Sequence, residues 1–198
     1  MSPVYRGRVQ ISPGFCLLTA WFCAVNGWRL LAVVLGAAAA HELGHWLALR
    51  LLGASVLGLR VGIFGAVMEI DTRQLSYGGE LFSVLAGPGA NLLCALGLIA
   101  LGRDMEVAAG AHLVLGVFNL LPVRPLDGGR ALYLLIAWGF DPTAGEQAAR
   151  WSGTLTAVAL AAGLCFVMVR SGGSLWLLPA AVGLLTAAWG EWRGKGSF

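Results

Sequence analysis

Long apolar stretches separated by short polar breaks run along the whole chain, and they predict membrane-spanning helices. A helix needs about 20 mainly apolar residues to cross a bilayer. Six segments of roughly this scale are present, at about 11–25, 30–52, 81–101, 107–121 (broken, then resumed at 131–140), 152–169 and 175–189. The first is as short as a signal-peptide core, but a second span follows at once, so we interpret it as a helix. The pattern predicts an all-α polytopic membrane protein, a six-transmembrane-helix bundle in which residues 1–198 form a single domain.

Composition agrees with a membrane setting. The chain is 58% hydrophobic and 12% charged, with a mean hydropathy of +0.79, which is far from soluble globular usage. The net charge of +3 does not indicate nucleic acid as a partner, because the basic residues lie between the apolar segments. The four cysteines lie in apolar stretches without CxxC spacing, so we expect packed small side chains rather than disulfides or metal ligands.

The distribution of basic residues predicts the orientation of the bundle. If the amino terminus is cytoplasmic, the ten basic residues of the inside segments are Arg6, Arg8, Arg50, Arg60, Arg73, Arg124, Arg130, Arg150, Arg193 and Lys195. The outside segments hold three, Arg29, Arg103 and Arg170. This excess follows the positive-inside rule, so we expect a multi-pass protein of the cell membrane with both termini in the cytoplasm.

The stretch between the second and third spans is not a good membrane helix. Residues 55–77 include four charged residues, yet 56–70 is largely apolar, with three glycines. A membrane-associated β-hairpin or re-entrant loop that dips toward the site fits this pattern, because non-helical backbone at depth must be buried or line a wet cavity. The alternative is a cytoplasmic loop at the membrane interface.

The second apolar segment contains the run His41-Glu42-Leu43-Gly44-His45. Ionisable residues at membrane depth are candidates for function. On a helix, positions i and i+4 lie on one face, so both imidazoles can reach a single Zn²⁺. Glu42 is then placed beside the metal to take a proton from its bound water. The alternative is a pair of helix-packing histidines, and a third ligand would argue against it.

Asp127 is the candidate third ligand. A catalytic zinc has three protein ligands and one position open to water. Asp127 lies in the segment NLLPVRPLDGG (119–129), after two prolines and before two glycines. Its backbone is therefore expected to be unwound and its carboxylate free to turn inward, giving a His₂Asp set close to the His₂Glu of soluble metalloproteases. The alternative is an ordinary loop aspartate at the membrane surface.

Three motifs together carry a family resemblance. HELGH in the second span, AGPGAN (86–91) in the third and NLLPVRPLDGG in the fourth resemble the site-2 protease family of intramembrane zinc metalloproteases. The resemblance covers about 30–137 and is greatest to the sporulation branch, that of stage IV sporulation protein FB. It implies zinc held by His41, His45 and Asp127, Glu42 as the general base, Asn119 in contact with the substrate or transition state, and the family's membrane hairpin at about 55–73.

The resemblance also implies a reaction and partners. We expect hydrolysis of peptide bonds in or next to transmembrane segments of membrane-associated substrates, with a sporulation precursor sigma factor as a candidate. The lipid bilayer and regulatory membrane proteins are further candidate partners. The CBS domain usual in the sporulation branch and the PDZ domain of the envelope-stress branch are not found in the sequence. A proteolytically silent scaffold or chaperone of the same fold is the alternative, and the intact Glu42 argues against it. A metal transporter would need polar ligands in several spans.

A few other polar residues need an interpretation. His112 is expected to make an interhelical hydrogen bond rather than line a water path. Asn91 is expected to bond either to another helix or to the active-site backbone, and the sequence does not choose between these. Glu69 and Asp71 fit solvated charges better than extra ligands. The eight tryptophans fit interfacial anchors.

Overall fold

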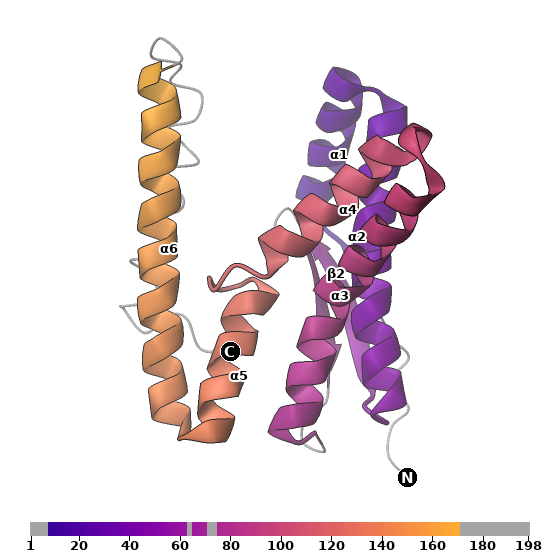
Figure 1. Cartoon of the computed structure of the whole chain (residues 1–198). Coiled ribbons are helices and arrows are strands. Elements are labelled where there is room, and N and C mark those ends of the chain that lie inside the picture. Colours follow the sequence, from indigo (N-terminus) through magenta and orange to yellow (C-terminus); the bar gives the residue numbers. More distant parts are fainter. Residues whose placement is uncertain (1–7, 63–64, 71–74, 171–198) are drawn as a thin grey trace. The chain divides into compact units, whose positions relative to one another are not determined.

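The structure, a computed structural model, describes residues 8–62, 65–70 and 75–170. It divides into two compact units, residues 1–118 and 119–198, and each is described by itself (Figure 1). The predicted sixth span, at 175–189, lies outside the described residues.

Unit 1 begins with two apolar helices, α1 (Pro13–Asn26) and α2 (Trp28–Leu51). The Ser12 hydroxyl caps α1 by accepting a hydrogen bond from the backbone N–H of Phe15 at 3.2 Å. The chain turns between the helices at Gly27, whose φ of +84° favours glycine. The helices predicted at 11–25 and 30–52 are therefore present, with ends shifted by one or two residues.

A three-stranded sheet accompanies these helices. Its strands are β1 (Arg8–Ile11), β2 (Val56–Gly62) and β3 (Gly65–Ile70), in the order β1-β2-β3. β2 and β3 are antiparallel, so the hairpin alternative for this stretch is correct. β1 pairs parallel to β2, from Arg8 opposite Gly58 to Ile11 opposite Val61. The hairpin was part of the predicted helical bundle, but β1 was not predicted, because a strand of four residues is too short to give a periodic signal.

The remaining helices of unit 1 are α3 (Tyr77–Leu101) and α4 (Glu106–Asn119), joined by the short 3₁₀ helix η1 (Arg103–Met105). The segment Gly87-Pro88-Gly89 does not mark a helix start, because Pro88 lies inside α3. The start is instead at the Ser76 cap, whose hydroxyl accepts from the N–H of Gly79 at 3.2 Å. Helices α2 and α3 pack closely, and a Cβ on Gly44 would lie 2.5 Å from the carbonyl oxygen of Ala86.

Unit 2 contains α5 (Asp127–Gly139) packed against α6 (Pro142–Arg170). Gly145 permits the contact, since a Cβ there would lie 2.8 Å from the carbonyl oxygen of Tyr133. α5 begins before the predicted 131, and α6 begins ten residues before the predicted 152. Hydropathy missed the first turns of α6 because they are polar. Asp141 caps this start by accepting from the backbone N–H groups of Thr143 and Ala144, at 2.6 and 3.1 Å, and from the Thr143 hydroxyl. The bond from the Thr143 hydroxyl, followed by the two backbone bonds, lowers the pKa of Asp141.

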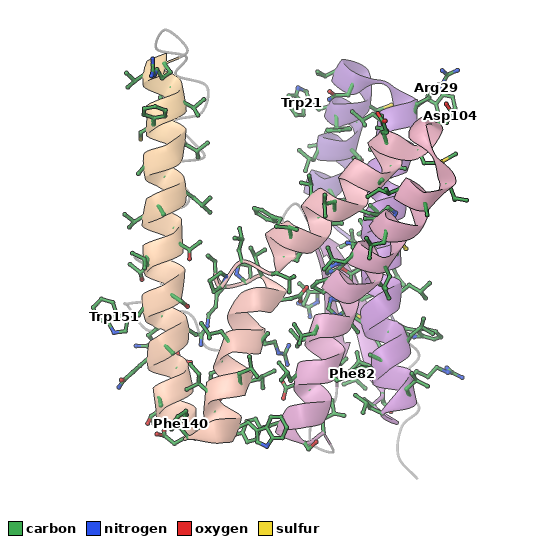
Figure 2. The ribbon with its side chains drawn as sticks, in the orientation of Figure 1. Trp21, Arg29, Phe82, Asp104, Phe140 and Trp151 are labelled. Carbon is green, nitrogen blue, oxygen red and sulfur yellow. The ribbon has the colours of Figure 1, made fainter. Side chains whose placement is uncertain are left out.

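Three described helices, α2, α3 and α6, are long and apolar enough to cross a membrane, and α1 and α4 are shorter apolar helices. Many large apolar side chains point outward. Trp21 in unit 1 and Trp151 in unit 2 project away from their own helices and are 62% and 65% exposed (Figure 2). Apolar surface on this scale indicates a membrane protein. The count of six spans and the orientation remain predictions.

Candidate metal centre

The two histidines of the HExxH motif face each other on α2. Their Nε2 atoms lie 3.0 Å apart, and the ring centroids are 4.7 Å apart with the ring planes at 82°. His41 is buried at 6% exposure, and His45 is half-buried. The helical spacing predicted from the sequence therefore brings together the same nitrogen of both rings.

Each ring is also held from behind, by its Nδ1 atom. His45 Nδ1 lies 2.7 Å from the carbonyl oxygen of Ser83 on α3, and His41 Nδ1 lies 3.2 Å from Nδ2 of Asn91 on the same helix. A carbonyl oxygen only accepts hydrogen bonds, so His45 Nδ1 carries the proton and the lone pair of the neutral ring is on Nε2. Metal-binding histidines are typically oriented by such a bond to the nitrogen that does not bind the metal.

The paired nitrogens fit zinc. Two imidazole nitrogens that each lie about 2.0–2.1 Å from one tetrahedral Zn²⁺ are roughly 3.3 Å apart. The observed 3.0 Å between the Nε2 atoms is close to this spacing. The alternative considered from the sequence was a pair of histidines that only pack between helices. Such packing would not require the two Nε2 atoms to face each other at a buried position.

Gly87 makes room for the second histidine. A Cβ on Gly87 would lie 2.2 Å from His45 Nε2 and 2.5 Å from its Cε1, so any larger residue would occupy the place of the ring. The segment 86–91 was recognised in the sequence as a motif, but this role of Gly87 was not predicted. The signal was the small residue itself, because a glycine inside a helix commonly marks a close approach.

Asn91 links three helices. Its side chain is completely buried on α3, and its amide contacts His41 on α2 and His112 on α4, with Oδ1 at 3.0 Å from His112 Nδ1. His112 therefore makes the interhelical hydrogen bond that the sequence predicted. The sequence left open whether Asn91 bonds to another helix or to the active-site backbone. In the structure it bonds to two other helices, and one of its partners, His41, is a candidate metal ligand.

The carboxylates of unit 1 take different roles. Glu42 follows His41 on α2 and is half-buried. Glu69 lies on β3, where it forms an ion pair with Arg60 at 2.5 Å, the two side chains being 44% and 64% exposed. The expectation of a solvated charge at Glu69 therefore agrees with the structure. Asp71 lies outside the described residues.

In unit 2, Asp127 is the first residue of α5 and is half-buried. The expectation of an unwound backbone at Asp127 was wrong, because the helix starts there. The two glycines that follow allow a tight turn: a Cβ on Gly128 would lie 2.1 Å from the carbonyl oxygen of Leu120, and one on Gly129 would lie 2.7 Å from the carbonyl carbon of Val123. The segment 120–126 therefore folds back directly against the start of α5.

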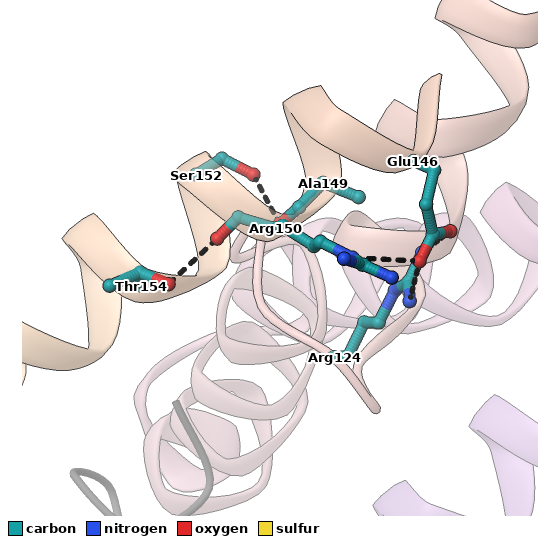
Figure 3. A network of polar contacts seen from close by, with 6 residues as sticks. All are labelled: Arg124, Glu146, Ala149, Arg150, Ser152 and Thr154. Atoms are coloured by element: carbon teal, nitrogen blue, oxygen red, sulfur yellow. Dashed lines mark hydrogen bonds and ion pairs between the residues drawn. The ribbon is translucent and has the colours of Figure 1, made fainter. Parts of the chain in front are cut away.

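An ion-pair network fixes this segment to α6 (Figure 3). The buried Arg124 donates from Nη1 and Nη2 to the two carboxylate oxygens of Glu146, at 3.0 and 2.5 Å. Arg150 donates from Nε to the same carboxylate at 3.1 Å, and the Ser152 hydroxyl donates to the carbonyl oxygen of Pro122 at 3.1 Å. Sequence reasoning counted Arg124 and Arg150 only as topology signals. Asn119, the last residue of α4, immediately precedes the tethered segment.

The fold is that of the site-2 protease from Methanocaldococcus jannaschii, with a TM-score of 0.66 at 20% identity, over 97% of this chain and 93% of that chain. No family model matches the chain. Rip3 of Mycobacterium tuberculosis, named as a presumed zinc metalloprotease, is 31% identical over 180 residues, which are 83% of this chain and 45% of Rip3.

Two further relatives carry similar names. A Synechocystis protein, sll0528, also named as a presumed zinc metalloprotease, is 30% identical over 49% of this chain and 28% of its own length. Zinc metalloprotease MJ0392 of Methanocaldococcus jannaschii is 26% identical over 56% of this chain and 35% of its own length. The chain thus spans less than half the length of these relatives. The comparisons support the site-2 protease family, and the predicted zinc agrees with the relatives' names and with the paired histidines. None of the names refers to sporulation.

Proposed function

We propose that this protein is an intramembrane zinc metalloprotease of the site-2 type, which hydrolyses peptide bonds in or next to transmembrane segments of other proteins. The observation that carries the proposal is the convergence of His41 Nε2 and His45 Nε2 at 3.0 Å, with both Nδ1 atoms hydrogen bonded to α3. The fold and the relatives' names support the same reading.

In the proposal, His41, His45 and Asp127 hold Zn²⁺. The three side chains offer two imidazole nitrogens and one carboxylate oxygen, a donor set suited to zinc. Asp127 belongs to unit 2, and the glycines behind it and the Arg124–Glu146 pair give its helix start a defined position within that unit. When bound, zinc lowers the pKa of a water molecule toward about 7 and polarises the scissile carbonyl.

The chain's own groups supply the remaining chemistry. Glu42 accepts the proton of the attacking water and then delivers it to the nitrogen of the leaving amine. The Asn119 amide binds the peptide backbone or stabilises the developing oxyanion. A helical substrate must first be unwound, and an exposed strand edge offers it replacement hydrogen bonds. β3 suits this role, because among the described strands it pairs only with β2.

The proposal extends to location and partners. The protein crosses the cell membrane several times with both termini in the cytoplasm, and its substrates are membrane-embedded or membrane-adjacent segments. A sporulation precursor sigma factor is a candidate substrate on the resemblance to the sporulation branch. Regulatory membrane proteins are candidate partners on the same basis.

The test is zinc content and peptide cleavage by the purified full chain, compared with Glu42→Gln. The variant should keep its zinc and lose cleavage, because Glu42 moves protons and does not bind the metal. Cleavage near the wild-type rate in Glu42→Gln would show that Glu42 is not the base. Zinc binding without cleavage in the wild-type protein would favour the silent scaffold or chaperone.

A further inference from the structure

Helix α6 holds the segment before α5 at two places. Arg124 donates from Nη1 and Nη2 to the two carboxylate oxygens of Glu146, at 3.0 and 2.5 Å (Figure 3). The Ser152 hydroxyl donates to the carbonyl oxygen of Pro122 at 3.1 Å. Because Glu146 and Ser152 are about 9 Å apart along the helix axis, the two contacts are made on different turns of α6. Two separate contacts fix the direction of the segment as well as its distance from α6.

The ion pair is the more specific of the two contacts. The Arg124 side chain is 8% exposed and the Glu146 side chain is 30% exposed. Burial removes the guanidinium from water, so the carboxylate is needed to compensate its charge. The planar guanidinium makes two bonds to one carboxylate, which sets its orientation as well as its position. Arg150 donates to the same carboxylate at 3.1 Å, but it lies on α6 itself. Glu146 is therefore the residue through which α6 fixes Arg124.

The backbone at Arg124 packs directly on the first turn of α5. A Cβ on Gly129 would lie 2.9 Å from the Arg124 backbone nitrogen and 2.7 Å from the carbonyl carbon of Val123. The backbone N–H of Leu126 donates to the carbonyl oxygen of Val123 at 2.8 Å, and the N–H of Gly129 donates to that of Leu126 at 3.1 Å. Asp127 lies within this packed turn as the first residue of α5. A movement of Arg124 therefore reaches Asp127 over a short path.

We propose that Glu146 is a positioning residue of the metalloprotease and acts through Arg124. It holds the segment 120–126, which connects two residues of the proposed site, Asn119 and Asp127. The inference rests on the proposed function, in which Asp127 binds zinc and Asn119 contacts the substrate. A metal ligand must be held within about 0.5 Å of its productive position. The ion pair supplies this precision from a helix that contributes none of the proposed site residues.

Positioning can be separated from stabilisation, because apolar side chains replace the packing of an ion pair but not its directional bonds. Replacement of a buried pair by apolar residues of similar volume is often neutral or stabilising. The double variant Arg124→Met/Glu146→Met should therefore recover the thermal stability that Glu146→Gln loses. The segment 120–126 would still lack its two fixed bonds to α6, so the zinc affinity of the double variant should stay low.

The test is the zinc affinity of the full chain in detergent, measured by competition with a chelator well below the unfolding midpoint of every variant. We expect Glu146→Gln and the double variant to bind zinc about 10–100-fold more weakly than the wild type, as when a residue that supports a metal ligand is lost. Co²⁺ bound in place of zinc should show a changed visible absorption spectrum in both variants, because that spectrum reports the ligand geometry.

Arg150→Gln is the matched control. It removes a part-exposed bond to the same carboxylate and should leave zinc affinity unchanged. Zinc affinity that recovers together with stability in the double variant would overturn the inference, since the pair would then act on stability alone. Wild-type affinity in Glu146→Gln would overturn it as well, while the proposed metal site would stand. If the wild-type chain binds no zinc, the proposed function fails and the inference fails with it. If Glu146→Gln does not fold, the double variant decides.

Discussion

The imidazole of His45 occupies the place where Gly87 would carry a side chain. A Cβ there would lie 2.2 Å from His45 Nε2, the nitrogen that faces His41. The contact joins α2 to α3 at the position where the candidate metal centre forms, so the close packing of the two helices and the geometry of the centre depend on one residue.

Gly87→Ala should therefore abolish zinc binding with little change in helix content. The added methyl cannot be accommodated unless the His45 ring moves, and a shift of about 1 Å at a ligand is enough to lose function. Zinc per chain in detergent and far-UV circular dichroism measure the two effects. Gly89→Ala is the control, because a Cβ at Gly89 meets nothing within 4 Å, and it should keep its zinc. Full zinc occupancy in Gly87→Ala would show that the ring can bind the metal from another position.

The Arg124–Glu146 pair should stabilise unit 2 and, through it, the start of α5. Arg124→Gln leaves the Glu146 carboxylate without its main partner, a change that costs up to about 3–5 kcal/mol for a fully buried pair and less here, because the Glu146 side chain is 30% exposed. Thermal unfolding followed by circular dichroism should show a clearly lowered midpoint. Arg150→Gln removes only a part-exposed i,i+4 pair and should cost about 0.3–0.5 kcal/mol. Equal effects of the two substitutions would contradict the role assigned to Arg124.

Local patterns predicted the features that depend on one helix or one hairpin. The i,i+4 spacing of His41 and His45 and the antiparallel pairing of β2 with β3 follow from short-range periodicity. The partners of these elements did not follow from it. Asn91 lies 50 residues after His41 and reaches it only because α2 and α3 pack closely. Arg124 reaches Glu146 across 22 residues, and its charge alone suggested nothing more than a cytoplasmic loop.

The starts of α5 and α6 were predicted incorrectly, because at these positions the residue types do not indicate that a helix begins. The first turns of α6 are polar and contain Glu146, the partner of Arg124, so hydropathy placed the start of this helix too late. The start of α5 at Asp127 was read as unwound because prolines and glycines surround it. In the structure the glycines instead allow the helix to begin against the preceding segment.

The predicted orientation can be tested with reporter fusions to truncated chains. A reporter after Phe140, between α5 and α6, and one after Phe198 should both report a cytoplasmic position, while a reporter near Arg103 should report an external one. The reason is the ten-to-three excess of basic residues in the inside segments. Paired reporters active on opposite sides of the membrane measure this directly. A cytoplasmic signal at Arg103 would break the six-span arrangement.

Asp127 carries the boldest prediction, because nothing in local spacing requires it to meet the histidines. A catalytic zinc with His41 and His45 alone would be one protein ligand short, and Asp127 lies at a helix start held by Gly128, Gly129 and the Arg124–Glu146 pair. Asp127→Ala should therefore lower bound zinc and peptide cleavage together. Asp127→Asn should lower both less, because an amide oxygen can still coordinate weakly.

The measurement is zinc per chain in detergent, with cleavage assayed on the same samples. Asp141→Ala is the control for a lost aspartate in unit 2: it removes the cap of α6, which costs about 1 kcal/mol of stability, and it should leave zinc content unchanged. Full zinc occupancy with cleavage retained in Asp127→Ala would exclude Asp127 as a ligand. Because Glu69 is paired with Arg60 at the surface, the search for the third ligand would then begin with Asp71.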